Sequence, residues 1–257
     1  MTAPINLFLV WTILFFCTCN CLPEFPVILL FVDSFKDTGN NSYINTIIKA
    51  EYLPYGQDYP GHLPTGRFSN GKLIPGMLAS ILGIKDTVPP LLDPTLSKHD
   101  LITGVKFCII WELGCRRMAV SGLPPLGSLP IQWKFVRLDL NPLEGQRRLD
   151  DQNRDSQVYD QELVKLFARI QTTLPVSKII YYDLYETIMD MVTHPNKYGF
   201  VETKKGCCES AILLCEPLAP SCKDPSKFLF WDMIHPTLAT YQYLVKYILK
   251  NVLLKLL

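Results

Sequence analysis

The chain has 257 residues, of which 48% are hydrophobic and 19% charged, a composition that supports a substantial core and is not that of a disordered protein. The formal net charge is +1 and the sequence contains no basic block, so it gives no indication of a nucleic-acid partner. The length suits one large domain or two small ones.

The N-terminal residues have the character of a secretory signal. Residues 5–21 form a short apolar stretch ending in small residues, whereas a membrane span needs about 20 apolar residues. One feature disagrees, because residues 1–6 contain no Lys or Arg. We expect a signal peptide at residues 1–21 and one domain over residues 22–257. The rival interpretations are an uncleaved anchor and a buried strand. Cleavage would give a secreted, extracellular protein without a stable membrane span.

Cysteine usage supports export. Three of the nine cysteines lie in the expected signal. The remainder is an even set: Cys108, Cys115, Cys207, Cys208, Cys215 and Cys222. In an oxidising compartment the C-terminal cluster predicts local disulfides, for which four cysteines allow three pairings. The cluster lacks two separated Cys-x-x-Cys pairs and nearby histidines, so zinc is a weak alternative.

An apolar run at residues 25–32 stops abruptly at Asp33-Ser34. Such a run, bounded by Pro and then by turn residues, predicts a strand buried on both faces. Ser34 would then lie at the carboxyl edge of a sheet, where open α/β folds bind ligands, which makes it a candidate nucleophile. The alternative is that Ser34 only caps the next helix. A glycosylation sequon at Asn40 is so close to Ser34 that its modification is doubtful.

Helical and strand-like segments alternate along the rest of the chain. Helices are expected at residues 43–49, 73–82, 161–174, 187–193 and from 237 onward. Strands are expected at residues 27–32, 100–108, 116–121 and 178–185. Residues 52–72 form a loop of ordered turns, and the polar residues 138–160 a surface connection. This alternation implies an α/β fold with a mainly parallel sheet. The last helix should pack on the sheet; binding to a membrane surface through Lys246, Lys250 and Lys255 is a less favoured alternative.

A second informative stretch, residues 230–236, contains Asp232 and His235 just before the last helix. A carboxylate three residues from a histidine can orient the imidazole, and the imidazole can accept the proton of Ser34. Alone, such a pair is more often a surface or capping feature. The other histidines lie in loops or at a helix end: His62, His99 and His194. The sequence contains no Gly-x-Ser-x-Gly elbow, phosphate loop or dinucleotide fingerprint, so no nucleotide cofactor is implied.

These segments together resemble the plant GDSL esterase/lipase family of the SGNH hydrolase superfamily. The matching segments are Val32-Asp33-Ser34 with residues 37–41, residues 55–61, 64–71, 113–117, 123–127, 195–200 and 205–208, and residues 230–232 with His235-Pro236. The resemblance implies a flavodoxin-like three-layer α/β/α fold and hydrolysis of carboxylic esters, often of lipids, outside the cell. Carried over by position, it implies Ser34 as nucleophile, His235 as base and Asp232 as its orienting partner, with no metal or cofactor.

The sequence departs from the family pattern around the oxyanion hole. Val32 replaces a Gly of the family, and no Gly-x-Asn-Asp motif is present. Phe107-Cys108 runs directly into a segment similar to the helix after that motif, so we expect an internal deletion and a sheet lacking one central strand. Loss of one oxyanion donor lowers turnover about 10²–10³-fold. Two functions therefore stay open: a serine ester hydrolase acting through an acyl-enzyme, and a catalytically impaired extracellular relative or truncated gene product. The natural substrate and any protein partners are not indicated.

Overall fold

The computed structural model describes residues 34–97, 116–137, 141–174, 176–208 and 213–256. The expected signal, the strands expected at residues 27–32 and 100–108, and Cys108 and Cys115 lie outside these ranges. The flavodoxin-like strand order, the missing central strand and the internal deletion therefore stay predictions.

Two pairs of parallel strands organise the described part of the chain. Strand β1 (Arg117–Ser121) pairs with β2 (Lys178–Tyr182), in register from Arg117 with Lys178 to Ser121 with Tyr182. Strand β3 (Glu202–Gly206) pairs with the shorter β4 (Phe228–Phe230). Parallel neighbours need a crossover, and helices α4 (Pro130–Arg137) and α5 (Pro142–Thr173) lie in the connection from β1 to β2. Helices combined with parallel strands confirm the predicted α/β class.

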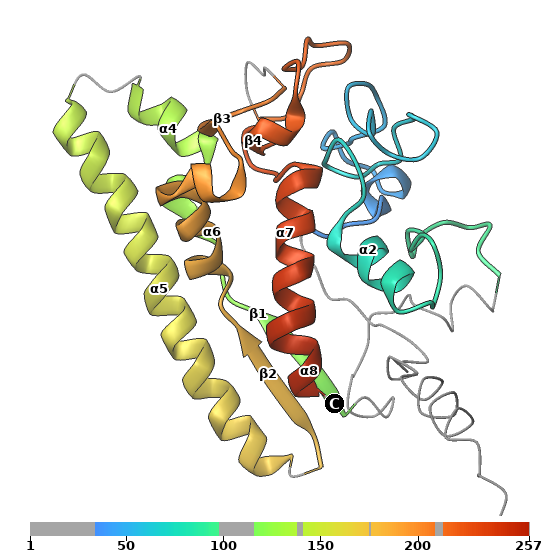
Figure 1. The fold of residues 1–257 in the computed structure, drawn as a ribbon, viewed down its shortest axis with the longest axis vertical. Helices are drawn as coiled ribbons and strands as arrows, with labels where there is room; N and C mark the ends of the chain where they lie inside the picture. The colour runs from blue at the N-terminus through green and yellow to red at the C-terminus, as the bar shows by residue number, and fades with distance from the viewer. Residues whose placement is uncertain (1–33, 98–115, 138–140, 175, 209–212, 257) are drawn as a thin grey trace, which may run out of the picture.

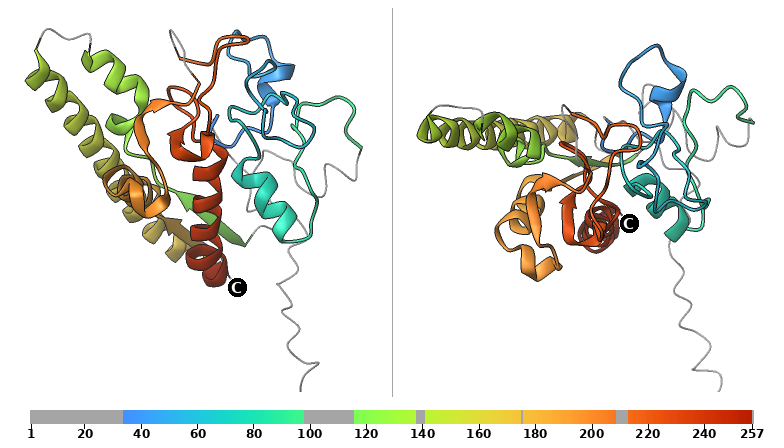
Figure 2. Two further views of the ribbon diagram at one scale, coloured as in Figure 1. Left: turned by 45° about the horizontal axis from the view of Figure 1, so that its top comes forward. Right: turned by 90° about the horizontal axis from the view of Figure 1, so that it is seen from above.

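Helices flank the β1–β2 pair on both sides. Helix α5 runs along one side of the pair, and α7 (Leu238–Ile248) lies on the other (Figures 1 and 2). Helix α7 continues through a π-helical turn, Leu249–Leu253, into α8 (Leu254–Leu256). In the described ranges, no helix is both long and apolar enough to cross a membrane.

The long helix α5 corrects the sequence-based expectation. Residues 138–160 were expected to form a surface connection, whereas a single helix of 32 residues spans Pro142–Thr173 and includes the helix expected at residues 161–174. The Asn141 side chain caps it by accepting from the Leu143 and Glu144 amides. The polar sequence was misleading because most of α5 faces solvent. Its buried positions are Gly145, Leu149, Ser156 and Asp160.

The prediction of a helix at residues 43–49 is also wrong. A 3₁₀ turn at Asn40–Tyr43 (η1) ends there, and the chain continues irregularly. The Thr46 hydroxyl accepts from the Ile48 amide at 3.1 Å, and this local bond competes with helical pairing. The β-branched side chains at these positions further disfavour a helix.

The other expected helices are present with shifted ends. Helix α2 (Ile74–Ile81) is followed by Gly83 at a φ of +69°, in the left-handed region that favours glycine after a helix. Helix α6 (Leu184–Thr193) begins earlier than expected, because the Asp183 side chain caps it by accepting from the Glu186 amide. Shorter 3₁₀ turns lie at Leu126–Ser128, Pro195–Tyr198 and Pro225–Lys227.

Two apolar clusters meet at the end of β4. The larger packs α2, α6, β4 and α7 together and includes Phe230. The smaller contains Trp231, the loop residues Tyr55 and Phe68, and cysteines of the C-terminal loop. Consecutive residues of the chain are thus fully buried in two different clusters. This anchoring fixes the backbone immediately before Asp232.

Candidate active site

The three residues singled out from the sequence lie in mutual contact. Ser34 Oγ is 2.8 Å from His235 Nε2, although the two residues are 201 positions apart. His235 Nδ1 lies 2.9 and 2.8 Å from the two carboxylate oxygens of Asp232. With the proton on Nδ1 donated to this carboxylate, Nε2 can accept the proton of the serine. The arrangement has the geometry of a serine nucleophile with its base and orienting anion.

Burial differs among the three residues of the site. Asp232 is fully buried and His235 is 2% exposed, whereas Ser34 is only half-buried. The ring of Phe68 stacks on the imidazole, with centroids 4.9 Å apart and planes 21° apart. The Phe35 ring contacts the same imidazole at 5.8 Å. The aromatic rings therefore cover the imidazole, while Ser34 stays partly exposed to solvent.

Four hydrogen bonds hold the buried carboxylate of Asp232. The backbone amides of Ile234 and His235 donate to Oδ1 at 2.8 and 2.7 Å, in a turn that the side chain itself stabilises. The Tyr55 hydroxyl donates to Oδ2 at 2.8 Å, and the imidazole completes the set. A buried carboxylate is costly unless it is paired and hydrogen-bonded, and this one is both.

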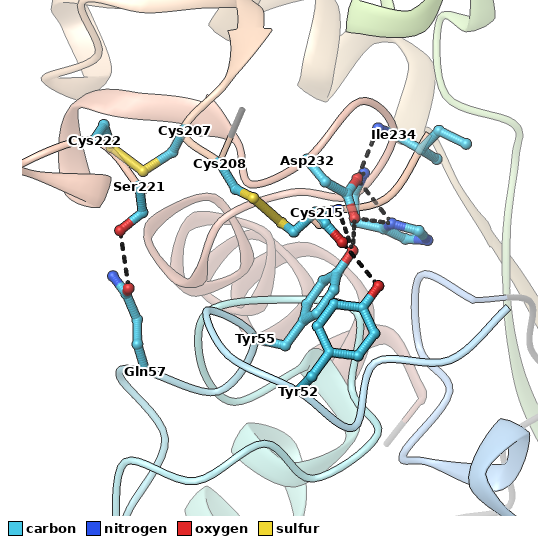
Figure 3. Close-up of a disulfide and its surroundings, with 11 residues drawn as sticks. Tyr52, Tyr55, Gln57, Cys207, Cys208, Cys215, Ser221, Cys222, Asp232 and Ile234 are labelled. Carbon is cyan, nitrogen blue, oxygen red and sulfur yellow. Dashed lines mark hydrogen bonds and ion pairs between the residues drawn. A yellow bond between two sulfur atoms is a disulfide. The ribbon is translucent and has the colours of Figure 1, made fainter. Parts of the chain in front are cut away.

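The Tyr55 contact was not found from the sequence. Tyr55 lies in a segment that carries the family resemblance, but nothing in its spacing links it to a carboxylate 177 positions away. Figure 3 shows its hydroxyl between Asp232 and Cys215.

Strand β3 and the β4–α7 connection hold the backbone of the site. The Trp231 amide donates to the His235 carbonyl at 2.6 Å, which closes the loop. A Cβ added to Gly206 would lie 2.6 Å from the Asp232 carbonyl oxygen, so only glycine permits this approach. Thr237 caps α7 through the Thr240 amide. Asp232 and His235 therefore lie on a short loop that these contacts hold in place.

The segment after Ser34 is held from three directions. The Tyr241 hydroxyl of α7 donates to the Phe35 carbonyl at 2.8 Å. Lys36 Nζ donates to the Ser121 hydroxyl at the carboxyl end of β1, at 3.1 Å. The Asp37 carboxylate accepts from the amides of the next turn, at residues 39–41. The site thus lies beside the carboxyl end of a parallel strand, the usual ligand-binding edge of such sheets.

Asn40, the sequon residue, has its side-chain amide engaged. Its Nδ2 donates to Asp37 Oδ1 at 2.7 Å, and its Oδ1 accepts from the Leu92 amide at 3.1 Å. The nitrogen that would carry a glycan therefore takes part in the turn that follows the candidate nucleophile. This engagement disfavours glycosylation of Asn40.

The C-terminal cysteines form two disulfides, as predicted. Cys207 pairs with Cys222 and Cys208 with Cys215, with Cα atoms 4.9 and 5.7 Å apart (Figure 3). This is one of the three pairings that the sequence left open. Because each of the four sulfur atoms belongs to a disulfide, these cysteines do not offer thiolates to zinc. In the part of the chain that the structure describes, no group of three or more His, Cys, Asp or Glu side chains is placed to hold a metal ion.

Comparisons with known proteins identify the family of this chain. The sequence model of the GDSL-like lipase/acylhydrolase family matches residues 106–248. Over 324 aligned positions the chain is 34% identical to the Arabidopsis thaliana protein "GDSL esterase/lipase At2g30310", covering 88% of this chain and 89% of the relative. The chain belongs to the GDSL lipase/acylhydrolase family. As a family member it is, by resemblance, a carboxylic ester hydrolase.

Two further Arabidopsis thaliana relatives of this GDSL protein show the same extent of similarity. "GDSL esterase/lipase At1g06990" is 35% identical, over 84% of this chain and 86% of the relative. "GDSL esterase/lipase At1g58430" is 32% identical, over 95% of each. The predicted family membership is therefore confirmed. The family-model match includes Asp232 and His235, whereas Ser34 precedes it.

Proposed function

We propose that this GDSL family member is a secreted serine ester hydrolase that cleaves carboxylic or lipid esters through an acyl-enzyme. One observation carries the proposal: Ser34 Oγ lies 2.8 Å from His235 Nε2, while Nδ1 of the same ring contacts the buried Asp232 carboxylate. A serine hydroxyl is a weak nucleophile unless a base removes its proton, and this geometry supplies that base.

The chemistry follows from these contacts. His235 Nε2 accepts the Ser34 proton as Oγ bonds to the ester carbonyl carbon, and the carbonyl oxygen becomes an oxyanion. The imidazolium, stabilised by Asp232, then protonates the leaving alcohol as the ester bond breaks. Water attacks the resulting acyl-serine, gives its proton to Nε2 and releases the carboxylic acid, after which Ser34 regains its proton. No metal or cofactor takes part in these steps.

Secretion is part of the proposal, and two features support it. The apolar residues 5–21 have the character of a signal. The two disulfides suit an oxidising compartment. Expression of the full chain in plant cells, with N-terminal sequencing of protein recovered outside the cells, tests this step. A protein retained in the cells with its N-terminus intact would contradict secretion.

The catalytically impaired alternative is not favoured by the comparisons, because these relatives are named as esterases or lipases. The 324 aligned positions nevertheless exceed the 257 residues of this chain, so the relative contains residues that have no counterpart here. This excess supports the expected internal deletion, whose position between Phe107 and Ile109 stays a prediction. Sequencing the transcript across these residues tests it.

The decisive experiment measures both turnover and serine reactivity. The secreted protein is incubated with p-nitrophenyl esters of increasing acyl length and, separately, with a fluorophosphonate probe, which reacts with activated serines. We expect hydrolysis and labelling by the wild type, and loss of both in Ser34→Ala. The control is Ser226→Ala, because Ser226 is exposed and its hydroxyl bonds only locally, to Asp224. Folded wild-type protein that neither turns over an ester nor accepts the probe would overturn the proposal.

A further inference from the structure

Tyr55 connects the candidate acid to the backbone of the cysteine loop. Its hydroxyl donates to Asp232 Oδ2 at 2.8 Å and accepts from the Cys215 amide at 3.1 Å. The side chain is fully buried and packs edge-on against Tyr52 and Phe68. With an acceptor on one side and a donor on the other, the hydroxyl has a single orientation in which both contacts are satisfied.

The tyrosine is suited to remain a donor. Burial, and next the negative charge of Asp232, raise the pKa of Tyr55 far above its ordinary value. The phenol therefore stays protonated throughout the range in which an ester hydrolase works. Its proton points to the carboxylate because the other contact of the hydroxyl is with an N–H group.

The disulfide Cys208–Cys215 fixes the other end of this contact. Cys215 supplies the amide that holds the Tyr55 hydroxyl, and its sulfur is bonded to Cys208. The Cys208 amide in turn donates to the carbonyl of Trp231, the residue before Asp232, at 2.8 Å. Figure 3 shows the part of this path that runs from the Asp232 carboxylate through Tyr55 to the Cys208–Cys215 disulfide. The Cys208 amide closes the path through the Trp231 carbonyl, next to Asp232 in the chain.

We propose that Tyr55 is a positioning residue that orients the Asp232 carboxylate for His235, and that the Cys208–Cys215 disulfide holds Tyr55 in that position. The inference rests on the proposed function, because it assigns a role within the same site. It predicts that the reactivity of Ser34 depends on the disulfide between Cys208 and Cys215.

The role predicts a change in the pH dependence of activity, with a definite sign. The hydroxyl shares the negative charge of the carboxylate, and removing it leaves that charge more available to the imidazolium. A stronger opposite charge raises the pKa of a histidine, so the acidic limb of activity should move to higher pH. Two tyrosines interact with the Asp232 charge: Tyr55, which donates to the carboxylate, and Tyr52, whose pKa is raised by burial and then by that charge.

The first test compares Tyr55→Phe with Tyr52→Phe. Both variants remove one phenolic hydroxyl, but the Tyr52 hydroxyl donates to the Cys215 carbonyl at 2.8 Å and not to Asp232. For Tyr55→Phe we expect kcat to fall about tenfold or more with little change in KM, and the acidic limb to rise by about half a pH unit or more. Tyr52→Phe should leave the limb in place. A Tyr55→Phe enzyme with the wild-type limb, whatever its stability, would overturn the positioning role.

The second test compares the two disulfides. Cys208→Ser/Cys215→Ser should move the acidic limb in the same direction as Tyr55→Phe. Cys207→Ser/Cys222→Ser, which removes the neighbouring disulfide, should lower the melting temperature without moving the limb. An unshifted limb in the first double variant would overturn the part assigned to the disulfide. If Tyr55→Phe does not fold, Cys208→Ser/Cys215→Ser still tests whether the position of Tyr55 affects the acidic limb.

An NMR titration of His235 separates this inference from the proposed function. With four histidines in the chain, the imidazole signals can be assigned by single substitution. A wild type that lacks esterase activity would refute the proposed function, whereas the pKa of His235 in wild type and in Tyr55→Phe would still be measurable. An unchanged pKa in that comparison would refute the role of Tyr55 by itself.

Discussion

Replacing Asp232 by Asn tests whether the carboxylate sets the proton position on His235. The amides of Ile234 and His235 both donate to Oδ1, so the amide oxygen of the new side chain must stay there. Its NH₂ group then takes the place of Oδ2, 2.8 Å from His235 Nδ1. Because this NH₂ group donates to an unprotonated Nδ1, the substitution favours the imidazole tautomer with its proton on Nε2.

The expected loss of turnover in Asp232→Asn follows from the geometry. A protonated Nε2, 2.8 Å from Ser34 Oγ, can donate to the serine but cannot accept its proton. An imidazole held in the wrong tautomer lowers kcat about 10⁴-fold, equivalent to about 5 kcal/mol of transition-state stabilisation. The Asn side chain fills the same space and keeps both backbone contacts, so the folded state should persist.

The assay is the pH dependence of kcat/KM for a short-chain p-nitrophenyl ester, together with the rate of fluorophosphonate labelling. Asp190→Asn is the matched control, because Asp190 Oδ1 also lies 2.8 Å from a histidine Nδ1, that of His194, at an exposed position. We expect the control to keep its turnover. A loss of less than about tenfold in Asp232→Asn, in a protein that loses all labelling in Ser34→Ala, would refute the tautomer argument.

Two other substitutions test how the fold supports the site. Gly206→Ala should lower kcat about 100-fold, because the new Cβ would lie 2.6 Å from the Asp232 carbonyl oxygen and must displace that backbone. The control is Gly76→Ala in α2, where a Cβ meets nothing within 4 Å and kcat should stay unchanged. Equal kcat values for the two variants would contradict this account. Asp160→Asn should raise the melting temperature at pH 7, because burial raises the pKa of the Asp160 carboxyl and its ionised form is destabilising. The wild type carries this carboxyl protonated below the ordinary Asp value of 3.8, so the gain should vanish as the pH falls toward that value, and melting curves from pH 4 to 8 showing a constant difference would refute the assignment.

The sequence alone predicted the candidate site residues, because each lies in a short local pattern. A serine after an apolar run and an Asp-x-x-His pair before a helix are local patterns, and the structure brings Ser34, Asp232 and His235 together. The polar strand β3 could not be found in this way. Its side chains include Glu202 and Lys204, and among its residues only Thr203 is buried, so it has no alternating apolar pattern. Its extended form depends on pairing with β4, a tertiary contact.

The loop of residues 52–72 illustrates why a site cannot be read from motifs alone. Its Pro, Gly and aromatic composition predicted ordered turns, but not what those turns would contact. In the structure, Tyr55 donates to Asp232, Phe68 stacks on His235 and Ser69 donates to the Pro236 carbonyl. Each contact joins positions more than 160 residues apart, so no local pattern encodes it.

The same contacts explain how a distant serine can meet its base. The acid and the base lie on one short loop before α7, whereas Ser34 comes from the other end of the described chain. The Asn70 side chain accepts from the Leu238 amide at 2.8 Å, which joins the loop of residues 52–72 to the start of α7. The Tyr241 hydroxyl, one turn further along α7, donates to the Phe35 carbonyl. One helix therefore holds both the aromatic loop that orients the Asp–His pair and the segment that carries the nucleophile, so a shift of α7 should misplace both partners of the proton transfer at once.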